Sequence, residues 1–213
     1  MGAFDLAIFD FDGTLADSMG WFADEMAAAG RRHGFRTPER NELQALRGLP
    51  ARRIVAELGV PLWKLPIIAA DMRARKLAAA AGLRLFDGVA EALEALASSG
   101  VRLAVVSSDS EASVRTTLGP DLERLIGRFE GGADLFGKAA KFRRVLKAMA
   151  VSPSRAITIG DEDRDALAAR EAGVAFAAVT WGFATPAALL DRGPALVFNR
   201  PSDFLQIAAR PGP

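Results

Sequence analysis

The sequence has no cysteine and a single histidine, His33. The absence of cysteine excludes disulfide bonds, thiolate metal sites and cysteine nucleophiles. A Ser-His-Asp triad or a multi-histidine zinc site would have to be built around His33 alone. Because arginines precede this histidine and Gly34 follows it, we expect it at the surface rather than in a catalytic site.

Net charge and long apolar runs are also scarce. The 27 basic and 26 acidic residues leave a formal charge of +1, and no run of like charges indicates a nucleic-acid partner. No apolar run approaches the ~18 residues of a membrane span, and the first ten residues lack the basic start of a signal peptide. We therefore expect a soluble, cytoplasmic monomer or homodimer without a membrane or nucleic-acid partner.

Short apolar runs predict a parallel β-sheet. Each is nearly continuous rather than alternating, which is typical of a strand covered on both faces. Helical patterns lie between most of them, so the sequence predicts an α/β fold with a Rossmann-like, doubly wound parallel sheet. Asp87 is expected to cap one of these helices. The predicted strands are Leu6–Phe9, Val101–Val106, Ala156–Ile159, Val174–Val179 and Leu196–Phe198.

One stretch breaks this alternation. Between residues 17 and 84 only helical patterns occur, interrupted by glycine and proline, and twelve basic against seven acidic residues give a charge of +5. We therefore predict a core domain of residues 1–16 and 85–213 with an inserted α-helical cap subdomain of residues 17–84. Most of the cap's charges are expected on solvated helix faces, with a few arginines toward an anionic substrate. Trp21 and Trp63 are expected in the cap core.

Two carboxylates follow the first predicted strand in the segment Asp10-Phe11-Asp12-Gly13-Thr14. In an open α/β sheet, ligands bind beyond the carboxyl ends of the strands. Two acids at such a place are costly unless a cation uses their charge, and Mg²⁺ binds one or two carboxylates together with phosphate and water. Gly13 would let the chain turn sharply after the second acid.

A second acidic segment follows the predicted strand Ala156–Ile159. Asp161 comes directly after this strand and Gly160, which favours metal binding, and Asp165 lies on the same face of a helix that begins here. Glu162 and Asp163 are explained by the favourable interaction of acids with a helix N-terminus.

Hydroxyl and ammonium groups stand at comparable places. Ser107 and Ser108 follow the predicted strand Val101–Val106. The alternative role for Ser108 or Asp109 is only to cap the next helix. Lys138 opens a helix, where its charge opposes the helix dipole and favours a functional role; the alternative for Lys138, as for Lys141, is a solvated lysine. The spacing from Gly132 to Lys138 resembles a phosphate-binding P-loop, but Ala139 replaces the required hydroxyl, so we reject a nucleotide site.

In this order, the motifs DFDGT, VVSS, GK and IGDEDRD resemble those of the haloacid dehalogenase-like (HAD) hydrolase superfamily. The resemblance covers essentially the whole chain, and DFDGTLADS is most similar to the branch of phosphoglycolate phosphatase and β-phosphoglucomutase. It implies that Asp10 is the nucleophile and forms an aspartyl-phosphate, while Asp12 protonates the leaving oxygen and then activates water. Because dehalogenases of this superfamily lack the second aspartate, Asp12 favours a phosphate ester over a halide.

The resemblance also implies the remaining roles. Ser107 would hold a phosphoryl oxygen, and Lys138 would neutralise charge on the phosphate and on Asp10. Asp161 would bind Mg²⁺ together with Asp10 and the backbone carbonyl of Asp12, and Asp165 would support the metal or Lys138. Weaker candidates for contacts with the substrate are Gly13, Thr14, Ser108, Arg47 and Arg52.

The expected function is therefore Mg²⁺-dependent hydrolysis of a small phosphorylated metabolite, a phosphomonoester like phosphoglycolate. Many relatives carry asparagine where Ser108 stands, which leaves open whether Ser107 or Ser108 binds phosphate. Asp109 would add negative charge near the phosphate if it pointed inward, so we expect it to cap the helix. Two alternatives remain, a phosphomutase and a catalytically silent protein that binds a phosphorylated ligand.

Overall fold

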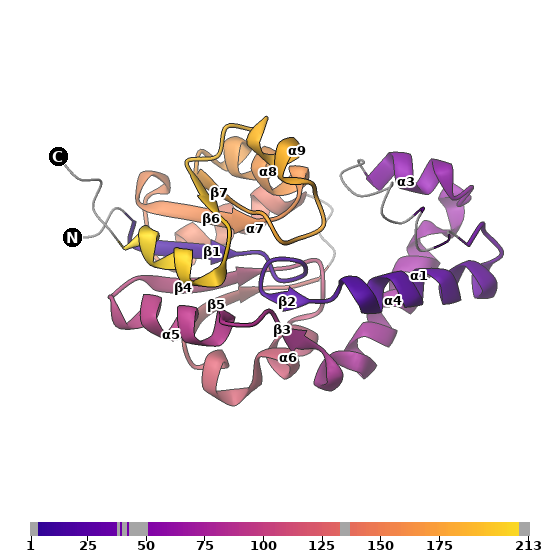
Figure 1. Cartoon of the computed structure of the whole chain (residues 1–213), viewed down its shortest axis with the longest axis horizontal. Helices are drawn as coiled ribbons and strands as arrows, with labels where there is room; N and C mark the ends of the chain where they lie inside the picture. Colours follow the sequence, from indigo (N-terminus) through magenta and orange to yellow (C-terminus); the bar gives the residue numbers. More distant parts are fainter. Residues whose placement is uncertain (1–3, 38, 40–41, 43–50, 133–136, 209–213) are drawn as a thin grey trace.

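The computed structural model describes residues 4–37, 39, 42, 51–132 and 137–208. Its centre is a parallel sheet with the strand order β5-β4-β1-β6-β7-β8 (Figure 1). The strands are β1 Leu6–Phe9, β4 Arg102–Val106, β5 Ile126–Glu130, β6 Ala156–Gly160, β7 Ala175–Val179 and β8 Leu196–Phe198. The order reverses direction at β1, so the chain that leaves β1 emerges at the switch point where open α/β sheets bind ligands.

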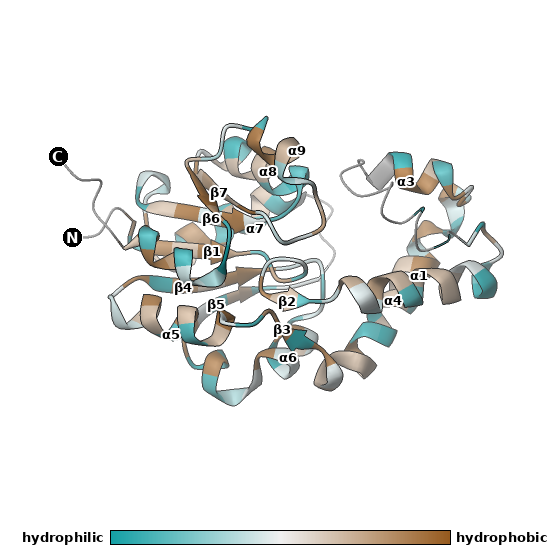
Figure 2. Cartoon of the chain, viewed as in Figure 1, coloured by the Kyte–Doolittle hydropathy of each residue, from teal (hydrophilic) through white to brown (hydrophobic). Residues whose placement is uncertain are grey.

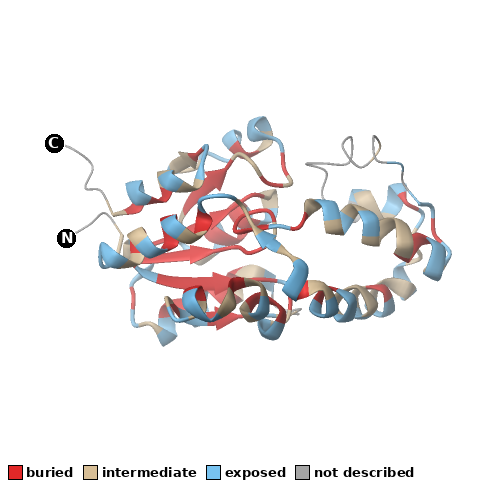
Figure 3. Ribbon diagram, turned by 60° about the horizontal axis from the view of Figure 1, so that its bottom comes forward, coloured by how far each residue is buried: buried red, intermediate tan, exposed pale blue. Residues whose placement is uncertain are grey.

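Helices cover both faces of this sheet. Successive residues of β1 point to opposite faces of the sheet. Phe9 packs into the hydrophobic cluster on the side of α5, and Ile8 packs into the cluster beneath α7 and α8. The central strands β1 and β6 are accordingly buried along their whole length, and most residues of the other strands are buried too (Figures 2 and 3). The helices around the sheet are α5 Val89–Ser98, α6 Glu111–Glu123, α7 Gly137–Ala148, α8 Asp163–Ala172, α9 Pro186–Leu190 and the 3₁₀ turns η3 Pro153–Arg155 and η4 Pro201–Ile207.

A second, helical region stands off one end of the sheet (Figure 1). It is joined to the sheet domain at an antiparallel pair of two-residue strands, β2 Ala16–Asp17 and β3 Arg84–Leu85. Its own small core is formed by Ala29, Phe35, Leu58 and Ile68. The helical elements of this region are α1 Met19–His33, α3 Ala51–Glu57, η1 Leu62–Lys64, α4 Leu65–Ala79 and η2 Ala80–Gly82.

The structure confirms the predicted fold class, and the five predicted strands are present within one residue of their expected bounds. The predicted division at residues 17 and 84 stays a prediction, although β2 ends and β3 begins at these positions. Among the described helices, none is long and apolar enough to cross a membrane.

Two local predictions were wrong, and one strand was not predicted. Strand β5 was missed because Gly127 and Arg128 interrupt its apolar pattern, as an edge strand with one neighbour allows. Gly88, in a left-handed conformation, precedes α5 in the place expected for Asp87. Trp63 is 71% exposed rather than part of the cap core, whereas Trp21 is half-buried.

Candidate active site

The first pair of acids lies at the carboxyl edge of the sheet. The backbone N–H of Asp10 donates to the carbonyl of Ile159 at 2.8 Å, which fixes Asp10 directly after the β1–β6 pairing. Its side chain is 3% exposed, and its Oδ1 accepts a hydrogen bond from the N–H of Phe11 at 2.8 Å. Asp10 therefore presents its carboxylate at the switch point from a rigid backbone.

Lys138 provides the positive charge next to Asp10. It lies in the first turn of α7, as expected, and its Nζ is 2.8 Å from Asp10 Oδ2 and also pairs with Asp165 Oδ1. Burial alone would lower the pKa of Lys138, but the charges of Asp10 and Asp165 raise it above its usual value. Lys138 is thus a cation held between two buried carboxylates.

Asp161 is the most enclosed acid of the site. It is fully buried, with Oδ1 accepting from the hydroxyl of Thr14 at 2.8 Å and Oδ2 accepting from the N–H of Phe183 at 2.7 Å. A Cβ atom at Gly13 would lie 2.2 Å from Asp161 Oδ2, and one at Gly182 would lie 2.4 Å from the same oxygen, so both turns require glycine. Gly13 also has a φ of +75°, which agrees with the sharp turn expected after Asp12.

Asp165 has a different set of contacts. Its Oδ2 accepts from the N–H groups of Asp161 and Glu162 at 3.2 and 3.0 Å, and Glu162 caps the start of α8 in a reciprocal capping box. The expected helix-terminus role of Glu162 agrees with this geometry. Asp165 therefore holds the 161–162 turn and Lys138 at once.

Together these side chains form a buried cluster with excess negative charge. Atoms of Asp10, Asp161 and Asp165 all lie within 4.8 Å of one another. Burial, and then the charges of Asp10 and Asp165, raise the pKa of Asp161 well above its ordinary value. Lys138 pairs with Asp10 and Asp165 but not with Asp161, so carboxylate oxygens remain for a hard cation such as Mg²⁺. The donor set fits that ion.

The two serines after β4 differ in their surroundings. Ser107 is 2% exposed and its Oγ accepts from the N–H of Asp109 at 3.0 Å, whereas Ser108 is exposed. Both serines line, with Lys138, a pocket of about 430 Å³. The hydroxyl of Ser107 keeps its own proton to donate into this space, so the geometry favours it over Ser108 for a phosphoryl oxygen.

Lys141 is not the solvated residue that was considered as its alternative. It is 4% exposed, and its Nζ donates to the carbonyl of Ser107 at 2.5 Å and to the carbonyl of Gly132. It lies one helical turn after Lys138 on α7, so both lysines point back to the strand ends. Lys141 fixes the backbone on which Ser107 stands.

Sequence reasoning missed a contact between the helical region and Asp12. Lys76, on α4, is 6% exposed; its Nζ pairs with Asp12 Oδ1 and lies 2.9 Å from Asp109 Oδ2. The expectation that Asp109 caps α6 was wrong, because Ser110 caps it by accepting from the N–H of Ser113. Burial and the charge of Asp12 raise the pKa of Asp109 to about 6, although Lys76 opposes this shift.

The sequence does carry a signal for Lys76. Ile68, Met72, Lys76 and Ala80 follow one another at intervals of four, so they form one row on the α4 face. Ile68 and Ala80 are buried and Met72 packs against the cap core. A lysine in an apolar row must find a buried partner, and the acids after β1 and β4 supply it.

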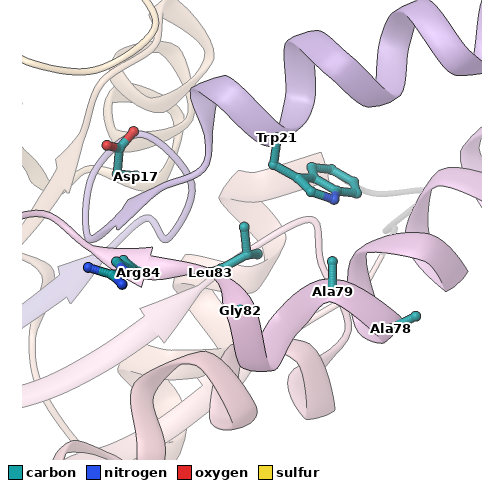
Figure 4. Close-up of a pocket in the computed structure, with 7 residues that line it drawn as sticks. All are labelled: Asp17, Trp21, Ala78, Ala79, Gly82, Leu83 and Arg84. Carbon is teal, nitrogen blue, oxygen red and sulfur yellow. The ribbon is translucent and has the colours of Figure 1, made fainter.

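A further pocket lies beside these contacts rather than at the carboxylate cluster. It has a volume of about 630 Å³, with Trp21 on one side and the residues Ala78 to Arg84 on the other (Figure 4). Asp17 and Arg84 lie at its β2–β3 end, where they are paired across the two strands. This pocket follows the junction of the two regions, and none of the predicted site residues lines it.

Two predicted substrate contacts lie outside the description. Arg47 falls among residues 43–50, which the structure does not describe, and for Arg52 it describes only the backbone, at the start of α3. Their proposed contact with substrate stays a prediction. The same holds for substrate contacts of Gly13 and Thr14, which the structure places against Asp161.

An α/β sheet with aspartates and a lysine at its switch point is typical of a class of hydrolases. Comparison of this sequence with known protein families identifies that class. The model of the haloacid dehalogenase-like hydrolase family matches residues 7–179. The chain therefore belongs to the haloacid dehalogenase-like hydrolase family, which confirms the predicted resemblance.

Relatives and solved structures agree with this assignment. The chain is 30% identical over 200 residues to a phosphoglycolate phosphatase of Synechococcus elongatus, covering 93% of this chain and 94% of the relative. It is 31% identical over 216 residues to a probable phosphatase of Dickeya dadantii, covering 95% and 93%.

The fold is shared with two solved structures at lower identity. A haloacid dehalogenase-like family protein from Streptococcus pneumoniae has a TM-score of 0.82 at 24% identity, covering 95% of this chain and 97% of that one. The protein CbbY from Rhodobacter sphaeroides, solved in complex with phosphate, has a TM-score of 0.74 at 22% identity, covering 94% and 96%. At these identities the likeness shows the fold.

Proposed function

We propose that this protein is a Mg²⁺-dependent phosphatase that hydrolyses a small phosphomonoester, of the size of phosphoglycolate, through an aspartyl-phosphate on Asp10. The observation that carries the proposal is the buried cluster of Asp10, Asp161 and Asp165 around Lys138 at the switch point of the sheet. A phosphoryl group needs positioning and charge neutralisation there, and the enzymes named among the relatives act on such esters.

Asp10 is the group that attacks phosphorus. Its carboxylate oxygen forms a bond to phosphorus while the ester P–O bond breaks, so one difficult displacement becomes two easier ones. Lys138 holds the Asp10 carboxylate in place and offsets the negative charge of the phosphoryl oxygens. Mg²⁺, bound by Asp10, Asp161 and the backbone carbonyl of Asp12, would supply further charge neutralisation on the same oxygens.

Asp12 moves the protons. In the first half-reaction it gives its proton to the leaving oxygen, and in the second it takes a proton from the water that attacks phosphorus and releases Asp10. Ser107 donates its hydroxyl to a phosphoryl oxygen, and Lys141 fixes the serine's backbone. Lys76 and Asp109 border the place where the leaving oxygen meets Asp12.

The first experiment is hydrolysis of an aryl phosphate, with inorganic phosphate measured beside the organic product. We expect activity with Mg²⁺, none in a chelator, and a loss of about 10⁴-fold or more in Asp10→Asn. Asp121→Asn is the matched control, because this aspartate is exposed on α6 and its side chain pairs with Arg124. Activity retained by Asp10→Asn or without metal would contradict the proposal.

The same assay separates a phosphatase from a phosphomutase, because a mutase would transfer the phosphoryl group to a second alcohol and release no inorganic phosphate. The cytoplasmic location and the monomeric or homodimeric state stay predictions from the sequence.

A further inference from the structure

Lys76 is a buried cation with two carboxylate partners from the core. Its side chain is 7% exposed, Asp12 and Asp109 hold its Nζ, and the ring of Trp21 lies 5.3 Å from it. The lysine comes from α4, whereas the acids come from the ends of β1 and β4. One positive and two negative charges therefore meet at the junction of the two regions.

Asp109 is held in this position by its backbone. Its N–H donates to Ser107 Oγ at 3.0 Å, and its carbonyl accepts from the N–H of Gly132. A Cβ at Gly131 would lie 2.9 Å from that carbonyl oxygen, so the backbone segment at Gly131 packs directly against Asp109. The side chain lies beside Lys76 and Asp12, and it is 10% exposed.

The location matters because Asp12 is the group that meets the leaving oxygen. The remainder of the leaving group must then lie close to Lys76 and Asp109. Lys76 lies between the carboxylates of Asp12 and Asp109, which already engage its charge. No positive charge of this trio is left for an anionic group on the leaving alcohol.

We propose that Asp109 is a specificity-determining residue that selects against phosphomonoesters whose leaving alcohol carries a negative charge. The proposal rests on the proposed function, and it narrows the substrate to phosphate esters of neutral or cationic alcohols. A carboxylate beside Asp109 would face a like charge in a partly buried site, where such repulsion costs more than in water. It would also compete with Asp109 for Lys76, a partner that is already engaged.

Three esters of nearly equal size test this. Phosphoglycolate has an anionic leaving alcohol, 2-hydroxyethyl phosphate a neutral one and O-phosphoethanolamine a cationic one. For the wild type we expect kcat/KM for phosphoglycolate to be about tenfold or more below that for 2-hydroxyethyl phosphate, with O-phosphoethanolamine at least equal to the neutral ester.

Substitutions should move this ratio in opposite directions. Asp109→Asn frees the charge of Lys76 and should raise the ratio of phosphoglycolate to the neutral ester by about tenfold, while Lys76→Gln should lower it. Asp109→Ser gives the same readout if the asparagine variant fails to fold, and Asp121→Asn should leave the ratio unchanged. A merely structural role of Asp109 would reduce all three esters alike, and a ratio that stays within twofold in the Asp109 variants would overturn the proposal.

Binding keeps this test separate from that of the proposed function. In the Asp10→Asn background, calorimetry with Mg²⁺ measures the affinities of phosphoglycolate and 2-hydroxyethyl phosphate with and without Asp109→Asn. If the wild type hydrolyses none of the esters, the proposed function fails, yet a tighter relative affinity for phosphoglycolate after Asp109→Asn still supports the role of Asp109. An unchanged relative affinity would overturn it.

Discussion

The sheet domain and the helical region each place a buried lysine against an aspartate of the segment Asp10–Thr14. Lys138 of α7 pairs with Asp10, and Lys76 of α4 pairs with Asp12. The first pair is built entirely from strand ends and helix starts of one domain, so its geometry is fixed by the fold of that domain. The second pair joins two regions, so it forms only when the helical region lies against the end of the sheet that carries Asp12. In the function proposed above, the core would carry out phosphoryl transfer and the junction would control the leaving group.

The largest effect should come from the core lysine. Lys138→Met leaves Asp10 and Asp165 without their shared cation, and we expect kcat to fall about a thousandfold with a smaller change in KM. Lys147→Met is the control, since this lysine is exposed at the end of the same helix. Steady-state kinetics on an aryl phosphate measure both variants. An equal loss in the two would show that the loss does not depend on the contact of Lys138 with Asp10.

A smaller effect is expected from the lysine of the helical region. Lys76→Met frees Asp12 to change its orientation, and we expect kcat to fall about tenfold to a hundredfold. If α4 only covers the site, Lys76→Arg should not restore activity, whereas a charge acting on Asp12 predicts partial rescue. A loss as large as that of Lys138→Met would show that the two lysines act equally on chemistry.

The serines sharpen the comparison within the core. Ser107→Ala should lower kcat/KM by about tenfold, because it removes a hydroxyl that can donate to phosphate beside Lys138. Ser108→Ala should change it by less than about twofold, since this side chain is exposed. The reverse order would transfer the role of phosphate binding to Ser108.

The smallest expected effect is a change in the thermal stability of the protein that arises from the carboxylate cluster. A raised pKa means that folded Asp161 binds its proton more tightly than the unfolded chain does. The metal-free protein should therefore lose stability as pH rises above the ordinary pKa of aspartate, until folded Asp161 itself ionises. Mg²⁺ should raise Tm by a few degrees at pH 7, and Asp161→Asn should remove this increase in differential scanning calorimetry. A Tm without any response to Mg²⁺ would contradict a metal at the cluster.

The core could be predicted well because its signals are local. Buried parallel strands read as short apolar runs, and the acids that matter follow two of them directly, as Asp10 and Asp161 do. The role of Thr14 as a donor to Asp161 was not foreseen, because 147 positions separate the two residues and only the folded turn brings them together.

The junction could not be predicted in the same way. The pairing of Lys76 with Asp109 depends on how one region lies on the other, which no periodicity within either segment encodes. The position of Lys76 in an apolar row showed that it needed a partner, but the row does not identify that partner. Asp109 was assigned to helix capping because the local pattern allowed it, and Ser110 one position later satisfied the same requirement.

The antiparallel strands β2 and β3 join the helical region to the sheet domain beside the active site. Lys76 lies eight positions before Arg84 and so close to these strands, while α3 lies at the far end of the helical region (Figure 1). A rotation about the two short strands would swing α3 through a wide arc and displace Lys76 by a small fraction of it. Lys76 would therefore stay near Asp12 and Asp109 during such a rotation, because it lies close to the axis.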